Sequence, residues 1–217
     1  MTSAPRLCGL ILAAGESSRM GSDKALLPWP PPATASTAST GQTLLSAGIL
    51  ALQPFTQAVI VVAGRNAQSL APLVAATGAA LVRNPNPERG QFSSLQTGLH
   101  ELLARGHDAA MITPVDCPPL RPTSLELLVD SFGRALGRSL WAAVPENNGK
   151  HGHPLLVNRD LIEALLAAPV TSNAREVLHA NARRIEYVSV PDSLAKPGLN
   201  TPQDYAAHAT KSAGPPR

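Results

Sequence analysis

The sequence predicts an α/β fold: a single-domain, Rossmann-like three-layer sandwich with a mostly parallel central sheet. Two observations support this class. Short, continuously apolar runs have the length of strands buried on both faces, and helix-like stretches separate them at the cadence of right-handed parallel α/β units. The expected strands are Leu7–Ala13, Ala58–Ala63, Ala79–Val82, Ala109–Thr113 and Leu140–Val144. The expected helices are Thr43–Leu52, Asn66–Ala76, Phe92–Arg105 and Pro122–Leu136.

Each expected element rests on its local pattern of apolar residues. Because the first run follows Arg6, it resembles the core of a short signal peptide. It leads, however, into Gly15 and a polar stretch ending at Arg19 rather than a small-residue cleavage site, which favours a buried first strand. The other expected strands are equally short and apolar. Among the helices, the one over Phe92–Arg105 has the clearest periodicity, with four leucines at helical spacing.

The length and the linker composition indicate one domain. A chain of 217 residues suits one domain better than two. We expect a single domain over residues 1–210, with a flexible insertion rich in Pro, Ala, Ser and Thr at 28–41 and a disordered tail at 211–217. The insertion is not an interdomain linker, because the alternation of strands and helices continues on both sides of it.

Composition excludes several classes of protein. No run approaches the roughly 18 apolar residues of a membrane span, so we expect no membrane partner. The net charge is +3, without a run of Lys or Arg and with only two Trp, two Tyr and three Phe for base stacking, so we expect no nucleic-acid partner. A small anionic substrate fits this charge. The only cysteines, Cys8 and Cys117, form no disulfide framework or metal-ligand spacing, which favours a reducing, cytoplasmic location.

The strongest functional signal follows the first expected strand and reads LAAGESSRMGSDK over residues 12–24. Small residues at Ala13, Ala14 and Gly15 allow close approach of a ligand, and successive N–H groups there suit phosphate oxygens. Arg19 and Lys24 add the guanidinium and the ammonium that a triphosphate requires. The segment matches neither a Walker A loop nor the G-x-G-x-x-G dinucleotide pattern. The alternative is an ordinary turn with two surface cations.

A carboxylate closes another expected strand, in the sequence TPVDCP over residues 113–118. Parallel sheets bind ligands beyond the carboxyl ends of their strands, where Asp116 is expected. A carboxylate there is well placed to hold Mg²⁺ against phosphate oxygens. The alternative is that Asp116 only forms a turn before Pro118.

Three further segments contain candidate contacts. Ser93 and Ser94 stand where a helix is expected to begin, so they either cap it or contact a nucleotide. His153 is one of two histidines spaced two residues apart in a Gly-rich loop, and the lack of a nearby third ligand argues against a transition-metal site. Asn200 opens the sequence NTPQD, which reads as a helix start with Thr201 as N-cap and Pro202 at the first helical position.

Taken together, these motifs resemble those of the nucleotidyltransferases that activate phosphorylated acceptors with an NTP, and most closely the molybdenum-cofactor cytidylyltransferase-like branch. The resemblance extends over Leu7 to Tyr205 and implies the fold of the nucleotide-diphospho-sugar transferases. One departure is Cys117, where related cytidylyltransferases usually have Gln. By resemblance, nucleotide contacts fall to Leu12, Ala13, Ala14, Gly15, Ser93 and Ser94, catalytic roles to Arg19, Lys24 and Asp116, acceptor contacts to His153 and Arg175, and metal ligation to Asp116 and Asn200.

The resemblance implies a Mg²⁺-dependent transfer of CMP from CTP to a phosphorylated acceptor such as molybdopterin, with release of pyrophosphate and without a general base. CTP is the expected donor because related guanylyltransferases carry Gly-Gly where this chain has Ala14-Gly15. A molybdoenzyme is a further partner that the resemblance suggests.

Other functions stay open at this point. Guanylyl transfer, a sugar or polyol phosphate acceptor, and a related reaction on a deazaflavin precursor would use the same machinery. A non-catalytic nucleotide-binding chaperone for molybdoenzymes also stays open, because Asn200 replaces a carboxylate and Cys117 is unusual. A redox enzyme is disfavoured, since Cys8 lies in an expected buried strand and the chain has no Cys-x-x-Cys.

Overall fold

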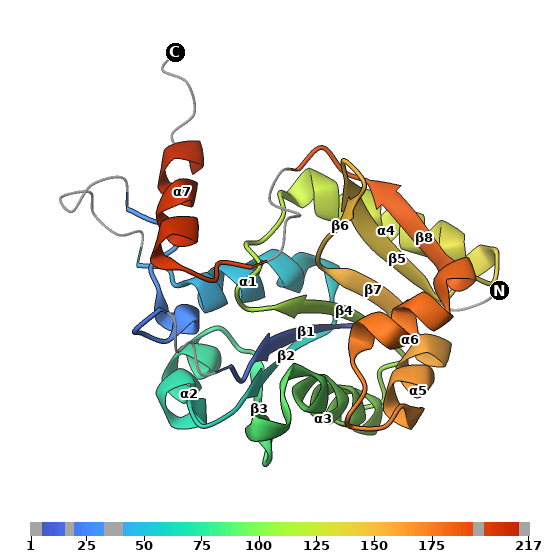
Figure 1. The fold of residues 1–217 in the computed structure, drawn as a ribbon, viewed down its shortest axis with the longest axis horizontal. Helices are drawn as coiled ribbons and strands as arrows, with labels where there is room; N and C mark the ends of the chain where they lie inside the picture. Colours follow the sequence, from blue (N-terminus) through green and yellow to red (C-terminus); the bar gives the residue numbers. More distant parts are fainter. Residues whose placement is uncertain (1–5, 16–19, 33–40, 193–197, 213–217) are drawn as a thin grey trace.

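A computed structural model describes residues 6–15, 20–32, 41–192 and 198–212. Within these ranges, eight strands form one mixed sheet in the order β3-β2-β1-β4-β7-β5, and β5 pairs in addition with β6 and β8. Helices cover both faces of this sheet, as Figure 1 shows. The predicted α/β three-layer sandwich is therefore confirmed.

The parallel half of the sheet is centred on β1 (Leu7–Ala13), whose seven residues are all buried. It pairs in parallel with β2 (Ala58–Ala63) on one side and with β4 (Ala109–Pro114) on the other, and β3 (Ala80–Arg83) extends the sheet beyond β2. The four apolar runs predicted for this half are thus strands, with ends that differ by at most one residue. Their carboxyl ends share one edge of the sheet.

The other half of the sheet contains antiparallel pairs that the sequence pattern did not predict. β7 runs antiparallel to both β4 and β5, whereas β8 runs parallel to β5. The strand expected from Leu140 begins later, because the Leu140 N–H still bonds the Ala135 carbonyl at the end of the preceding helix. The bounds are Ala142–Asn147 for β5, Lys150–His151 for β6, Leu155–Asn158 for β7 and Ile185–Ser189 for β8.

In the described ranges, six helices supply the outer layers. Apolar side chains of α1, α2 and α4 form one buried cluster with one face of the sheet, and those of α3, α5 and α6 form a second cluster with the other face. The four predicted helices are confirmed within one residue at each end. The bounds are Leu44–Leu52 for α1, Ala67–Ala76 for α2, Gln91–Ala104 for α3, Pro122–Gly137 for α4, Arg159–Ala167 for α5 and Ala174–Ala180 for α6. Short 3₁₀ turns are η1 (Lys24–Leu26), η2 (Gln53–Phe55), η3 (Pro87–Arg89) and η4 (Ala182–Arg184).

The predicted insertion at 28–41 is anchored at its base. The Trp29 N–H donates to the Gln42 carbonyl, and the Trp29 side chain is buried beside Leu44 and Leu199. Residues 33–40 lie outside the described ranges. The Trp29 indole is therefore a hydrophobic anchor within the first residues of the segment that was expected to be flexible.

A seventh helix, α7 (Pro202–Ser212), follows the predicted NTPQD motif. Its last two residues fall inside the segment expected as a disordered tail, and residues 213–217 lie outside the described ranges. None of the helices in the described part of the chain has the length and apolarity needed to cross a membrane.

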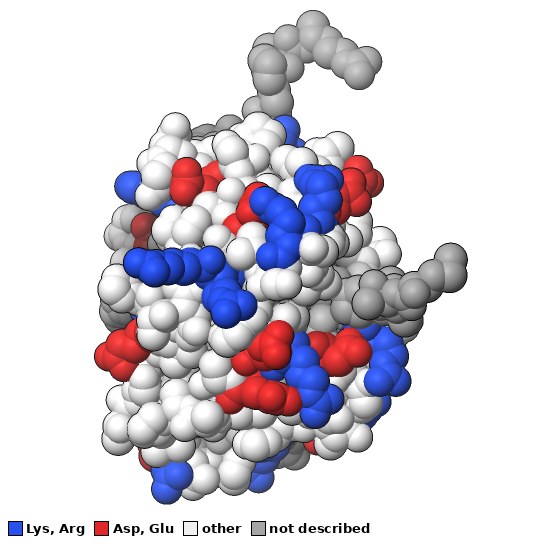
Figure 2. All heavy atoms as spheres, turned by 90° about the vertical axis from the view of Figure 1, so that its right-hand side faces the viewer, with Lys and Arg blue, Asp and Glu red and all other residues white. Residues whose placement is uncertain are grey.

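The surface carries charges of both signs. Figure 2 shows basic and acidic side chains interleaved on the face at the right of Figure 1. Two exposed ion pairs are local, Arg105 with Glu101 and Arg159 with Glu163, each joined at 2.7 Å across one helical turn. Among the described residues on the face in Figure 2, the two signs mix without the continuous basic stripe typical of nucleic-acid-binding proteins.

Candidate active site

The candidate site lies where β1, β2 and β4 end. The loops that follow these strands carry the residues of the two main motifs and meet at the same edge of the sheet (Figure 1). The N–H of Val115 donates to the Leu12 carbonyl at 2.9 Å, which continues the pairing of β1 with β4 beyond the strands. The glycine-rich loop and the Asp116 loop are therefore neighbours, as ligand binding at the carboxyl edge requires.

Lys24, Asp116 and Asn200 form the centre of this site. The Lys24 ammonium nitrogen lies 3.2 Å from Asp116 Oδ2 and 3.1 Å from Asn200 Oδ1. The side chains of Lys24 and Asp116 are 11% and 25% exposed, so the ion pair is only partly open to solvent. Two oxygens from distant parts of the chain thus converge on one positive charge.

The Asn200 segment is held in place by main-chain and capping bonds. The Leu199 N–H donates to the Asp116 carbonyl at 2.8 Å, and the Leu199 side chain is buried. Thr201 caps α7 by accepting the Asp204 N–H, while the Asp204 carboxylate accepts the N–H groups of Thr201 and Asn200. The hydrogen bonds that the Asp204 carboxylate makes with the side chain and then the backbone of Thr201, and with the Asn200 N–H, lower the pKa of Asp204. The predicted helix start at Thr201 is confirmed, and it coexists with the placement of Asn200 beside Lys24.

Helix α7 packs against the base of the 28–41 segment. The Tyr205 hydroxyl donates to the Pro28 carbonyl. Leu199, Trp29, Leu44 and Ala47 form a small buried cluster beneath this bond, and Tyr205 packs against it. This contact joins two segments that are 177 positions apart in the chain, next to the candidate site.

The glycine-rich loop passes directly over the turn that follows β2. A Cβ atom at Gly64 would lie 2.8 Å from the Ala14 carbonyl oxygen and 3.3 Å from the Ala14 Cβ, so only glycine permits this approach. Leu12 and Ala13 are buried at the end of β1, whereas Gly15 is exposed. Arg19, the second predicted cation, lies outside the described residues.

Ser93 and Ser94 lie three and four residues beyond Gly90, the N-cap residue of helix α3. Helix α3 begins at Gln91, after Gly90 with a φ of 90°, so both serines lie inside its first turn. Their buried hydroxyls accept hydrogen bonds of 2.9 Å from the side-chain amide of Asn84. Asn84 also accepts the Asn86 N–H and thereby shapes the loop before α3. The serines support this loop through Asn84.

His153 lies where the chain enters β7, beside the end of β4. Leu155, two residues later, pairs with Ile112 of β4. In the described part of the chain, the buried Nδ1 of His153 has no hydrogen-bond partner. Burial lowers the pKa of His153, although a backbone hydrogen bond at Ile112 and the charge of Asp116 act in the opposite direction. His153 is therefore neutral near pH 7 and suited to hydrogen bonding rather than to charge pairing.

The second histidine of the loop, His151, has partners of its own. Its ring stacks on Tyr187 with centroids 4.2 Å apart, and its Nε2 lies 3.5 Å from a Glu146 carboxylate oxygen. Among the described residues, no three His, Cys, Asp or Glu side chains are grouped to hold a metal. A metal held by Asp116 and Asn200 would therefore take its other ligands from substrate or water.

Arg175 is distant in the fold from the centre of the site. It is exposed in the first turn of α6, a helix that packs with α5 over the second apolar cluster. The central contacts described above join Lys24 to Asp116 and Asn200 and do not involve Arg175. Its predicted acceptor contact remains a prediction.

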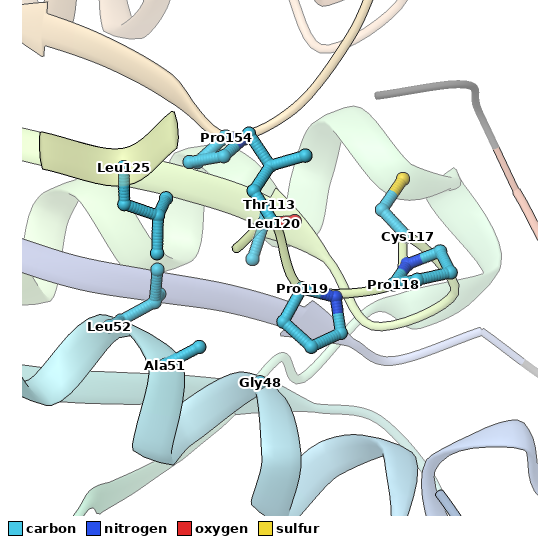
Figure 3. A pocket seen from close by; sticks show the side chains of 10 residues that line it. All are labelled: Gly48, Ala51, Leu52, Thr113, Cys117, Pro118, Pro119, Leu120, Leu125 and Pro154. Carbon is cyan, nitrogen blue, oxygen red and sulfur yellow. The ribbon is translucent and has the colours of Figure 1, made fainter. Parts of the chain in front are cut away.

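A small apolar cavity borders the Asp116 loop. Figure 3 shows it between α1 and the segment Cys117–Leu120, with Thr113 and Pro154 on its other side. Its volume is about 20 Å³, room for about one water molecule. Burial first, and then the Asp116 charge, raise the pKa of Cys117 to about 12. Cys117 thus contributes apolar packing and not a thiolate.

Asp23 and Asn66 are residues beside the site that sequence reasoning missed. Their side chains are joined by a hydrogen bond of 2.7 Å from Asn66 Nδ2 to Asp23 Oδ2. Asp23 stands immediately before Lys24, and Asn66 follows β2 at the carboxyl edge. The signal in the sequence that could have identified Asn66 is its position just after an expected strand.

The chain is similar to known proteins over most of its length. A family described as the MobA-like NTP transferase domain matches residues 9–185. The chain belongs to this family. As a MobA-like NTP transferase, it is a nucleotidyltransferase, which confirms the class of enzyme that the motifs predicted.

Individual relatives span most of the chain. The molybdenum cofactor guanylyltransferase of Rhodobacter capsulatus is 31% identical over 215 residues, covering 93% of this chain and 94% of that protein. The molybdenum cofactor cytidylyltransferase of Escherichia coli K12 is 27% identical over 176 residues, covering 78% of this chain and 79% of that protein. These relatives differ in the nucleotide that their names specify.

Solved structures share the fold at lower identity. Rv0371c of Mycobacterium tuberculosis H37Rv superimposes with a TM-score of 0.74 at 22% identity, covering 94% of this chain and 98% of that one. CMP:2-keto-3-deoxy-manno-octonic acid synthetase superimposes with a TM-score of 0.71 at 17% identity, covering 96% and 98%. Both likenesses support the nucleotidyltransferase fold that the sequence predicted.

Proposed function

We propose that this MobA-like NTP transferase catalyses Mg²⁺-dependent transfer of CMP from CTP to a phosphorylated acceptor, molybdopterin, with release of pyrophosphate. The observation that carries the proposal is the convergence of Asp116 and Asn200 on the Lys24 ammonium at the carboxyl edge of the sheet. That cluster combines a cation for phosphate oxygens with two oxygen ligands for a metal. The names of the relatives support an acceptor from molybdenum cofactor synthesis, and the name of one solved structure of this fold, a molybdopterin-guanine dinucleotide biosynthesis protein A, supports molybdopterin.

The chemistry of the donor set fits Mg²⁺. A carboxylate oxygen of Asp116 and an amide oxygen of Asn200 are hard ligands, and both already face one cation. Mg²⁺ typically takes one or two such protein ligands and completes its octahedron with phosphate oxygens and water. When bound, the metal would neutralise charge on the triphosphate. The solved complex of Rv0371c with manganese supports a divalent metal in a protein of this fold.

The protein's own residues would act by positioning and charge neutralisation. Lys24 and Arg19 would hold the phosphates, and the main-chain N–H groups around Ala14 and Gly15 would approach them closely. The acceptor phosphate attacks the α-phosphorus of CTP, the bond to the bridging oxygen breaks, and the electron pair leaves with pyrophosphate. Because the acceptor phosphate is already an anion, no general base is required.

The choice of CTP rests on the resemblance of residues 14 and 15 to the cytidylyltransferase branch. GTP is the second candidate, because the Rhodobacter capsulatus guanylyltransferase matches more of the chain than the Escherichia coli cytidylyltransferase does. Both donors would use the same triphosphate site. The base is the only part of the substrate on which the two proposals differ.

The acceptor would lie toward the loop that carries His153. The neutral His153 imidazole carries a single N–H, so a bond from it to an acceptor phosphate oxygen would replace its backbone bond at Ile112. Arg175 would add a charge if the acceptor extends toward α6. Transfer of the finished cofactor to a molybdoenzyme would follow.

Cys8 and Cys117 are both free thiols, which supports a reducing, cytoplasmic setting.

Thermal unfolding with four nucleotides tests this function. CTP, GTP, ATP and UTP are compared with and without Mg²⁺, since a ligand at 100 times its Kd stabilises the folded state by about 2.7 kcal/mol. A Mg²⁺-dependent shift with CTP alone supports cytidylyl transfer. A preference for GTP replaces the donor but keeps the reaction, and the absence of any shift would favour a non-catalytic module.

Asp116→Ala should abolish metal-dependent turnover and leave the fold intact, because the carboxylate is partly exposed and lies outside the apolar clusters. Pyrophosphate release with CTP and molybdopterin measures the loss, and circular dichroism checks the fold. Asp130→Ala, which removes an exposed carboxylate from α4, is the matched control. An active Asp116→Ala enzyme would remove Asp116 from the metal site.

A further inference from the structure

The side chain of Asn66 uses both its oxygen and its nitrogen within the candidate site. Its Oδ1 accepts the Gly64 N–H at 3.0 Å. Its Nδ2 donates to the Ala13 carbonyl at 2.9 Å and to Asp23 Oδ2 at 2.7 Å. One amide group therefore ties the end of β1 and the turn after β2 to Asp23.

Asp23 links Asn66 to the turn that begins with Lys24. Its other carboxylate oxygen accepts the Ala25 N–H at 3.0 Å and so caps the 3₁₀ turn η1, which begins with Lys24. The Lys24 ammonium then reaches Asp116 and Asn200. A continuous path of contacts thus runs from the ends of two strands to the centre of the site.

Asn66 does not have the usual role of an asparagine at the start of a helix. It occupies the N-cap position of α2, yet its side chain makes no capping bond to that helix. Asn158 and Asn173 occupy the same position in α5 and α6, and both accept an N–H from the first turn. An N-cap bond stabilises the helix that it begins. Helix α2 lacks this stabilisation, and the Asn66 side-chain amide bonds Ala13 and Asp23 beside the candidate site instead.

We propose that Asn66 is a positioning residue for nucleotidyl transfer, which acts through Asp23 to hold Lys24 beside the end of β1 in the geometry that binds the triphosphate. This inference rests on the proposed function. It predicts that disturbing the Asn66–Asp23 pair weakens nucleotide binding without unfolding the protein.

Asp23→Asn is the most informative single variant. Asparagine at position 23 can still accept the Ala25 N–H with its Oδ1, but its side-chain NH₂ then faces the NH₂ of Asn66, and two donors form no hydrogen bond. The substitution also removes a negative charge near the phosphates, so electrostatics alone would tighten binding of an anionic nucleotide. Loss of positioning predicts the opposite, a Kd for Mg²⁺–CTP or Mg²⁺–GTP that rises about tenfold.

Asn66→Asp and the double variant complete the cycle. Asn66→Asp places two carboxylates together and should weaken binding by about tenfold or more, on the order expected for a displaced supporting residue. Asp23→Asn with Asn66→Asp restores one donor, one acceptor and the original net charge between the two positions. It should regain part of the affinity but not all of it, because a carboxylate at position 66 cannot donate to the Ala13 carbonyl. Non-additivity in this cycle measures the coupling.

Asn158→Asp is the matched control. Asn158 also donates to a neighbouring aspartate, Asp160, at 2.8 Å, but it lies at the opposite end of β4 from Asp116. Its Kd for the nucleotide should equal that of the wild-type protein. Thermal unfolding without nucleotide confirms for every variant that the fold persists.

Isothermal titration calorimetry with Mg²⁺–CTP and Mg²⁺–GTP tests the inference on five proteins: the wild type, Asp23→Asn, Asn66→Asp, the double variant and Asn158→Asp. Weaker binding by both single variants, partial recovery in the double variant and an unchanged control support the inference. Wild-type or tighter binding by Asp23→Asn would overturn it, as would a double variant no better than Asn66→Asp. If the wild-type protein binds neither nucleotide, the proposed function fails and the inference fails with it, whereas wild-type binding with unaffected variants overturns the inference alone.

Discussion

Lys24 illustrates how one side chain can serve two states of a site. In the structure its ammonium lies between the two oxygens that are proposed to hold Mg²⁺. A metal ion held by these oxygens would repel the Lys24 ammonium, so the two cations compete for the same place. Arrival of the metal with its nucleotide would therefore move the ammonium from these oxygens to the phosphates.

Replacing Lys24 by methionine should separate these two roles. Without the ammonium, Mn²⁺ in the absence of nucleotide should bind more tightly, because no internal cation competes for Asp116 and Asn200. Nucleotide should bind about tenfold to a hundredfold more weakly, since a charge-assisted hydrogen bond contributes about 1.5–3 kcal/mol. Paramagnetic resonance of Mn²⁺ and calorimetry of CTP measure the two effects. Lys150→Met, on the exposed strand β6, is the control, and unchanged Mn²⁺ affinity in Lys24→Met would contradict the competition.

The two thiols should be unreactive in the folded protein at pH 8. Burial raises the pKa of Cys8 to about 11 and that of Cys117 to about 12, from 9.0 in each case. At pH 8 the thiolate fraction of Cys8 is then about one in a thousand, against roughly one in ten when unfolded. The folded state binds these protons more tightly, so the associated stability is complete below pH 9 and falls as the pH rises toward 11. Iodoacetamide labelling with and without denaturant measures the difference, and labelling of the folded protein at the unfolded rate would contradict it.

At the scale of residues, sequence reasoning found the groups that lie in motifs. Lys24, Asp116 and Asn200 could be predicted because each belongs to a segment with a recognisable chemical pattern, and the structure brings all three together. Asn66 could not, since an asparagine before an expected helix predicts a cap. The burial of the Ser93 and Ser94 hydroxyls against Asn84 depends on a contact across a loop, which no local pattern shows.

At the scale of elements, the close packing of α3 on β1 depends on Gly98. A Cβ atom at that position would lie 2.6 Å from a Leu10 methyl and 2.8 Å from a Val62 methyl. Gly133 lies in α4 and is exposed, and among the described residues a Cβ atom there would meet no neighbouring side chain or element within 4 Å. Both glycines thus lie in helices, but Gly98 is packed tightly against the sheet whereas Gly133 faces open space.

Alanine at these two positions should change stability in opposite directions. Gly98→Ala should lower the free energy of unfolding by about 1–2 kcal/mol, because overpacking exceeds the gain in helix propensity. Gly133→Ala should raise it by about 0.5–1 kcal/mol through helix propensity alone. Urea unfolding measures both. A stabilised Gly98→Ala protein would show that the Leu10 and Val62 side chains yield without cost.

The elements that sequence patterns missed share a physical cause. Strands β1, β2 and β4 are buried on both faces and read as continuous apolar runs, so they could be predicted. β7 is only four residues long, and of the five residues of β8 only Ile185 and Val188 are buried. Their pairing is set by long-range contacts with β4 and β5, which a single short segment does not encode.

At the scale of the whole molecule, the two large apolar clusters share the central strands and should unfold together. Trp29 lies in the small cluster beside α7, whereas Trp141 lies against the second large cluster and under the Arg184 guanidinium. Fluorescence of Trp29→Phe and Trp141→Phe proteins therefore reports on separate places. Coincident urea transitions in the two proteins, matching circular dichroism, are expected for one cooperative unit. An earlier transition at Trp29 would show that the cluster beside α7 opens by itself.

The bond from Leu199 to the Asp116 carbonyl has a consequence for how the protein is made. Lys24 and Asn200 are separated by 176 positions, and the ribosome makes Asn200 long after the strands that precede Lys24 and Asp116. Strands β1 to β8 and all the residues of the two large apolar clusters precede Asn200 in the chain. A nascent chain can therefore assemble much of its apolar interior while its proposed metal centre still lacks one ligand. The proposed metal centre is completed last, so a translation product that ends before Asn200 would be folded in large part but should lack nucleotidyl transfer activity.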